Sequence, residues 1–78
     1  MRFDAAWPGR VFQWVDKGTA WRAESESLYV VLSKWTPPGS SAHLKILVLH
    51  TTYPYHTPAS IMELRPSDRM WVEAKRIV

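Results

Sequence analysis

Two segments near the middle of the chain, Leu28–Trp35 (LYVVLSKW) and Leu44–His50 (LKILVLH), decide the fold class. Both are rich in β-branched, aliphatic and aromatic residues, and each has about the usual length of a β-strand. Their near-continuous apolarity indicates central strands that are covered on both faces. The side chains that we therefore expect to be nearly inaccessible to solvent are Val30, Leu32, Ile46 and Val48.

Weaker strand signals lie on both sides of this central pair. Arg10–Val15 (RVFQWV) follows a Pro8-Gly9 breaker, and Ser60–Leu64 (SIMEL) follows a loop that contains two prolines. The segment Thr36–Ser41 has the composition of a loop and separates the two central strands. The sequence therefore predicts an all-β fold in which short strands follow one another along the chain.

Residues 68–78 fit two structures. In a strand, Met70, Val72 and Ala74 share one face. In a helix, Met70, Trp71 and Ala74 lie at the spacing of one apolar side. Both alternatives stay open, so a short C-terminal helix is compatible with the predicted sheet.

Composition predicts one small domain over residues 1–78, with a core at about residues 8–75. The chain is 46% hydrophobic and 22% charged, which favours a folded core over disorder. It contains no cysteine, and no apolar run approaches the ~20 residues that cross a bilayer. We expect a cytoplasmic protein that has no membrane partner and no signal peptide.

The residues that would carry catalysis are sparse. A cysteine nucleophile and a Gly-x-Ser-x-Gly motif are both absent, and three glycines are too few for a phosphate-binding loop. Asp16, Glu24 and Glu26 are interpreted as solvated loop charges. His50 and His56 could face each other across a hairpin as metal ligands, but surface and loop positions are the better interpretation. We therefore predict no enzyme, no cofactor and no metal site.

Aromatic residues next to cations are the most informative feature, because five Trp exceed what the core of so small a protein can hold. Such pairs suit a protein interface or a platform on which bases stack, and they also suit small clusters that hold long loops in place. The predicted partner-binding residues are Trp14, Trp21, Arg22, Trp35, Tyr53 and Tyr55. The basic residues of the nucleic-acid alternative are Arg65, Arg69, Lys75 and Arg76.

The order of these elements resembles an SH3-like small five-stranded β-barrel. The segment 16–27 occupies the place of its first long loop, and Arg65-Pro66-Ser67-Asp68 resembles the turn before its last strand. The opening Pro8-Gly9-Arg10-Val11 is similar to the start of KOW-type barrels, and short bacteriophage-encoded proteins often resemble this pattern. An ALYDY-like motif is absent and His43-Leu44-Lys45 replaces a Trp-Trp pair, so polyproline binding is not implied.

The resemblance implies a non-enzymatic binding module. A protein partner is favoured because the net charge of +3 is modest. A phage-type protein that docks on and modulates a host protein is one form of this hypothesis. Nucleic-acid binding by a KOW-like barrel is the alternative, and a homodimer formed through an exposed edge strand or through the aromatic surface is compatible with either.

Overall fold

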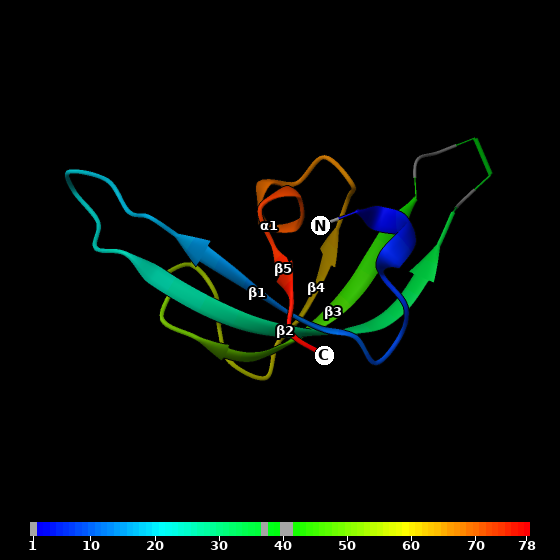
Figure 1. The fold of residues 1–78 in the computed structure, drawn as a ribbon, viewed down its shortest axis with the longest axis horizontal. Helices are drawn as coiled ribbons and strands as arrows, with labels where there is room; N and C mark the ends of the chain where they lie inside the picture. Colours follow the sequence, from blue (N-terminus) through cyan, green and yellow to red (C-terminus); the bar gives the residue numbers. More distant parts are fainter. Residues whose placement is uncertain (1, 37, 40–41) are drawn as a thin grey trace.

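The computed structural model describes residues 2–36, 38, 39 and 42–78. Five antiparallel strands form one sheet in the order β4-β3-β2-β1-β5 (Figure 1). The predicted all-β class is therefore confirmed. In chain order the elements are η1 (Phe3–Ala5), β1 (Val11–Asp16), β2 (Ser25–Trp35), β3 (His43–Thr51), β4 (Ile61–Leu64), α1 (Arg69–Val72) and β5 (Lys75–Arg76). The predicted loop Thr36–Ser41 lies partly outside the described residues.

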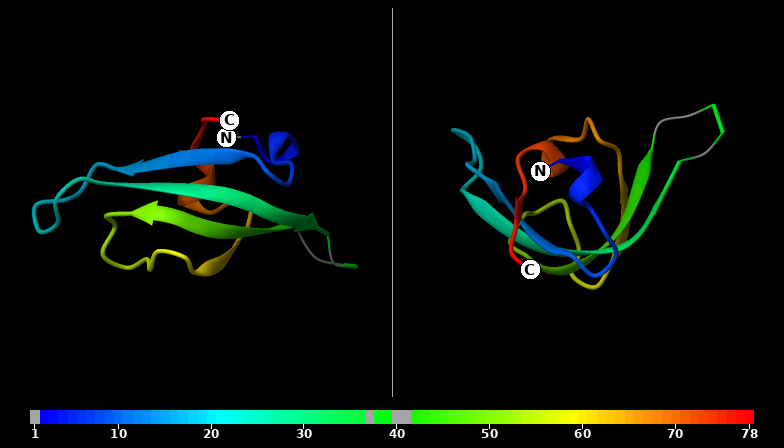
Figure 2. Two further views of the ribbon diagram at one scale, coloured as in Figure 1. Left: turned by 90° about the horizontal axis from the view of Figure 1, so that it is seen from below. Right: turned by 45° about the vertical axis from the view of Figure 1, so that its right-hand side comes forward.

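The sheet is strongly curved, and it is not closed into a barrel. Its two edges are β4 and β5, which do not pair with each other in the described part of the chain. The short helices η1 and α1 lie over the concave side of the curved sheet (Figure 2). The prediction of a closed barrel is therefore wrong. The physical reason is that β4 and β5 are too short to complete a ladder, with four and two residues.

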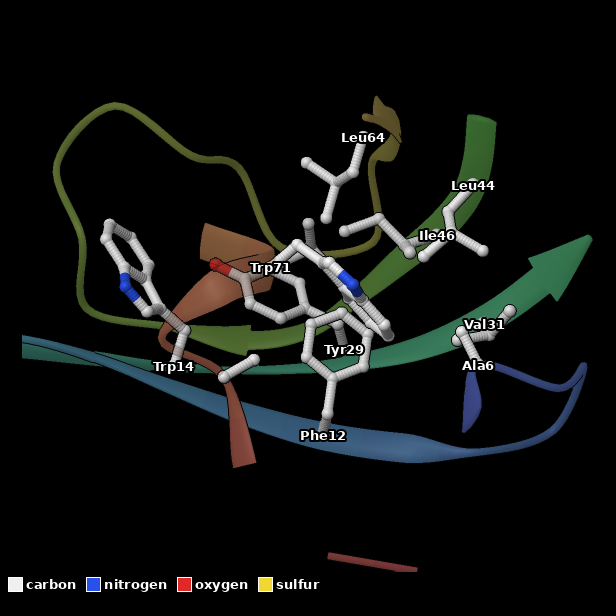
Figure 3. Close-up of a cluster of buried hydrophobic side chains, with 11 residues drawn as sticks. Ala6, Phe12, Trp14, Tyr29, Val31, Leu44, Ile46, Leu64 and Trp71 are labelled. Carbon is white, nitrogen blue, oxygen red and sulfur yellow. The ribbon is translucent and has the colours of Figure 1, made fainter. Parts of the chain in front are cut away.

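The core lies between the concave face of the sheet and α1. Figure 3 shows the rings of Phe12, Tyr29 and Trp71 grouped at its centre. Phe12 and Trp71 meet edge to face at a centroid distance of 5.1 Å. The buried hydrophobic residues are Ala6, Phe12, Trp14, Tyr29, Val31, Leu44, Ile46, Val48, Leu64, Trp71 and Ala74.

Of the four residues predicted to be buried, Ile46 and Val48 are confirmed and the two on β2 are wrong. The core face of β2 carries Tyr29 and Val31, whereas Val30 is half-buried and Leu32 is 39% exposed on the outer face. The run of apolar residues in β2 fits either face, so alternation alone could not choose between them. Packing of Tyr29 against the other buried rings determines which face of β2 points into the core.

The C-terminal segment combines the two predicted alternatives. One turn of helix, α1, places Trp71 in the core, and β5 then pairs with β1. A four-residue helix is not stable by its own hydrogen bonds, so the burial of Trp71 holds it in place.

Candidate functional site

The loop between β1 and β2 is tied to α1 through one buried carboxylate. Nη2 of Arg22 donates to both oxygens of Asp16 at 2.9 Å, and Nη2 of Arg69 donates to Oδ2 at 2.6 Å. The hydrogen bond from Arg22 lowers the pKa of Asp16 below its ordinary value, against the opposing effect of burial. The interpretation of Asp16 as a solvated loop charge is therefore wrong, because the fold brings Arg69 of α1 into contact with its carboxylate.

Gly18 allows this loop to turn sharply. Its backbone has φ +78°, and its N–H donates to Oδ1 of Asp16 at 2.7 Å. A Cβ at this position would lie 2.5 Å from the carbonyl oxygen of Arg22, so only glycine fits. The backbone of Thr19 and Arg22 then closes a tight turn, and Trp21 on that turn is 96% exposed.

The loop between β3 and β4 brings a second group of aromatic residues to the same place. Tyr53 meets the ring of Trp14 edge to face at 5.1 Å, and the guanidinium carbon of Arg22 lies 5.2 Å from the ring centroid of Tyr53. Tyr55 packs against Tyr53 and remains 74% exposed. The two loops, which are far apart in the sequence, therefore share one aromatic and cationic surface.

His56 connects this surface to the core. Its Nδ1 lies 3.2 Å from the hydroxyl of Tyr29. Burial lowers the pKa of His56 and raises the pKa of Tyr29 to about 12. Both groups are therefore neutral at pH 7, and the ring of His56 packs as part of the Trp14 and Tyr53 cluster.

A cavity of about 490 Å³ lies where these loops, β4 and α1 meet; we call it the aromatic cleft. Apolar side chains of Met62, Leu64 and Met70 form part of its wall, and the ring of Trp14 forms another. The positive and negative charges of its lining residues balance, because two arginines and two carboxylates line it. The lining residues are Trp14, Arg22, Tyr53, His56, Met62, Glu63, Leu64, Asp68, Arg69 and Met70.

The structure brings together most of the predicted partner-binding residues. Trp14, Arg22 and Tyr53 line the aromatic cleft, and Trp21 and Tyr55 extend from the same two loops. Trp14 itself is only 2% exposed, so it is part of the cleft wall and not of the outer surface.

Trp35 does not belong to this group. It is the last residue of β2, at the opposite end of the strand from the loop that carries Trp21. Its ring stacks on His43 at a centroid distance of 5.4 Å.

The four basic residues of the nucleic-acid alternative do not form one patch. Lys75 and Arg76 lie on β5 and Arg65 directly follows β4, which is the opposite edge of the sheet. Arg69 is engaged by Asp16 and by Glu73, whose Oε1 lies 2.9 Å from Nε of Arg69. The charge of Arg69 is therefore already neutralised.

Sequence reasoning missed seven residues of this region. Asp16 was interpreted as a solvated loop charge, and His56 as a surface or loop residue. The other five were assigned no role in a site and are Met62, Glu63, Leu64, Asp68 and Met70. The alternation in Arg10–Val15 extends one residue further to Asp16, so it places this residue on the same face as Phe12 and Trp14. That alternation is the one signal that could have indicated its burial.

Two absences concern the described residues only. They contain no group of three or more His, Asp or Glu side chains that could hold a metal ion. No helix among them has the length and apolar character required to cross a membrane. No protein-family model, curated protein or solved structure matches the chain.

Replacing Asp16 by asparagine should destabilise the protein at pH 7, because the amide is uncharged and keeps one acceptor oxygen where the carboxylate pairs with two arginines. Because the pKa of Asp16 is lowered in the folded protein, its carboxylate stabilises the fold at pH values above the ordinary carboxyl pKa of about 3.9. This stabilisation is lost as the pH falls towards the folded-state pKa. Urea midpoints should therefore differ clearly at pH 7, begin to converge as the pH falls below about 4, and meet only below the lowered pKa of Asp16.

The matched control is Asp4→Asn, because the ion pair of Asp4 with Arg2 is largely exposed. This control should not change the urea midpoint. An equal difference between wild type and Asp16→Asn at pH 7 and at acid pH would contradict the electrostatic role of Asp16.

Proposed function

We propose that the protein is a non-enzymatic protein-binding module that uses the aromatic cleft and the exposed rings beside it. The observation that carries this proposal is the combination of the exposed side chains of Trp21 and Tyr55 with the neighbouring aromatic cleft, whose lining is partly apolar and balanced in charge. Exposed aromatic rings on shaped surfaces supply most of the binding energy in protein interfaces. Docking on a host protein, in the manner of short phage-encoded proteins, is the form of this function that the sequence resemblance favours.

The strand order also supports a small binding module. A meander in which β5 returns to pair with β1 is the arrangement expected of an SH3-like architecture, here with an open sheet. Fold alone does not define function, so the proposal depends on the site.

Nucleic-acid binding is supported less well. Phosphate binding requires cationic side chains that are free to neutralise phosphates and so release the counterions of the nucleic acid. In the aromatic cleft both arginines contact Asp16, and Glu63 and Asp68 add negative charge. The exposed Arg65, Lys75 and Arg76 are divided between the two edges of the sheet.

Trp21→Ala and Tyr55→Ala should each weaken binding to the captured partner by about 2 kcal/mol or more. The thermal midpoint should remain unchanged, because both side chains are largely exposed. The partner is captured from cell lysate with and without nuclease, purified, and titrated against each variant by calorimetry. Trp7→Ala is the matched control, since Trp7 is an exposed tryptophan outside the predicted set.

Two results would contradict the proposal. One is a loss of stability in both variants with unchanged affinity of the folded protein, which would mean that these rings only hold loops in place. The other is capture that disappears with nuclease and with added salt, which would favour nucleic acid.

A further inference from the structure

Within the part of the chain that the structure describes, the edge of the sheet beside the aromatic cleft has no strand paired to it. β4 pairs with β3 on one side only. The N–H of Val48 donates to the carbonyl of Ser60 at 2.9 Å, and the strand register continues from this pair to Met62 and Leu64. Because hydrogen bonding alternates along an antiparallel strand, the backbone groups of Ile61 and Glu63 are directed to the open side.

The same strand forms a wall of the aromatic cleft. Met62 and Leu64 line the cleft, whereas the side chain of Ile61 is exposed on the opposite face of β4. A strand added at this edge would place alternate side chains in the cleft and the others beside Ile61. Both faces of such a strand would therefore find apolar contacts.

Two buried donors border the cleft without an acceptor. Among the described residues, Nε1 of Trp14 and Nε of Arg22 have no hydrogen-bond partner. Buried donors of this kind are uncommon in folded proteins and need an explanation. Asp68 by contrast already accepts a hydrogen bond from the backbone of Arg65. Among the described residues, the N–H groups of Trp14 and Arg22 therefore lack a hydrogen-bond acceptor at the end of the cleft that holds the two arginines.

From these observations we infer that the edge of β4 binds an extended peptide segment of a partner protein as a sixth strand. The segment has apolar residues at alternate positions, which enter the aromatic cleft. It offers a hydrogen-bond acceptor at the end of the cleft where Trp14 and Arg22 hold N–H groups without a partner. This inference rests on the proposed protein-binding function and specifies the kind of partner.

A displayed library of random peptides, selected on the full chain, tests the inference. The selected peptides should show apolar residues with a period of two and no central proline. Glu63→Pro removes the outward N–H and leaves the pairing of β4 with β3 intact. It should weaken peptide binding about tenfold or more, because the lost N–H would have donated to the peptide. Glu63→Ala is the matched reference, because it removes the same carboxylate and keeps the N–H; the loss in Glu63→Pro is measured relative to it.

A change in the peptide keeps the test valid if Glu63→Pro does not fold. N-methylation of alternate peptide amides should abolish binding in one register and not in the other. Selected peptides that bind equally well when methylated in either register, or that are rich in proline, would overturn strand addition while leaving the protein-binding function intact.

Two other outcomes would overturn the inference in different ways. The first is a wild-type dimer in sedimentation that Glu63→Pro makes monomeric, with no peptide selected; the occupant of the edge would then be a second copy of the chain. If no peptide is selected, no dimer forms and only DNA binds in a salt-sensitive manner, the proposed function fails as well.

Discussion

Trp71→Ala should unfold most of the protein in the absence of denaturant. The side chain of Trp71 is buried and packs edge to face on Phe12. Removing a buried tryptophan side chain costs about 3–5 kcal/mol, and a single core in a domain of this size supplies about the same amount. The effect is large because α1 has no other buried residue that could keep it on the sheet.

Two controls separate packing from helix formation. Trp71→Phe keeps a ring in the core and should retain a cooperative urea transition at a lower midpoint. Val72→Ala changes an exposed residue of the same helix and should cost less than about 1 kcal/mol. Circular dichroism in increasing urea measures all three variants. A wild-type midpoint for Trp71→Ala would show that α1 does not hold the core together.

Ile46→Ala should cost about 2–5 kcal/mol, whereas Leu32→Ala should cost about 1 kcal/mol or less. Ile46 is fully buried in β3 between the sheet and the helices. Leu32 lies on the outer face next to an irregularity in the pairing of β2 with β3. The two residues come from equally apolar segments, so the comparison isolates the face of the sheet.

Urea unfolding of both variants, with native-state hydrogen exchange on β2 and β3, measures this difference. The midpoint of Leu32→Ala should lie close to that of the wild type. Equal destabilisation by the two substitutions would mean that the outer face of β2 is covered as thoroughly as the core.

The strands themselves could be predicted from local sequence. β1, β2 and β3 are the segments richest in β-branched and aromatic residues, and the predicted boundaries agree with the observed ones to within a few residues. The face of β2 could not be predicted, because residues 28–32 are all apolar and carry no alternation. Pairing irregularities at Leu28/Tyr29 and Val31/Ser33 further weaken any simple count along the strand.

The candidate site was predicted by residue type but not by arrangement. An aromatic residue next to a cation indicated Trp21 and Arg22, and a proline-rich loop indicated Tyr53 and Tyr55; the structure places these residues on two neighbouring loops. One of the two arginines that pair with Asp16, Arg69, is 53 residues away in the sequence, so this contact could not be predicted from the local sequence. A contact between residues so far apart leaves no periodic signal in the chain.

What the sequence by itself determined is therefore the all-β class, the central strands and the types of side chain available for binding. These follow from local propensity and composition, which act within a few residues. Only the tertiary structure decided that the sheet stays open, that Trp71 fills its concave side and that Asp16 joins the β1–β2 loop to α1. Each of these depends on which distant surfaces pack together, and burial and charge pairing across the sheet set that choice.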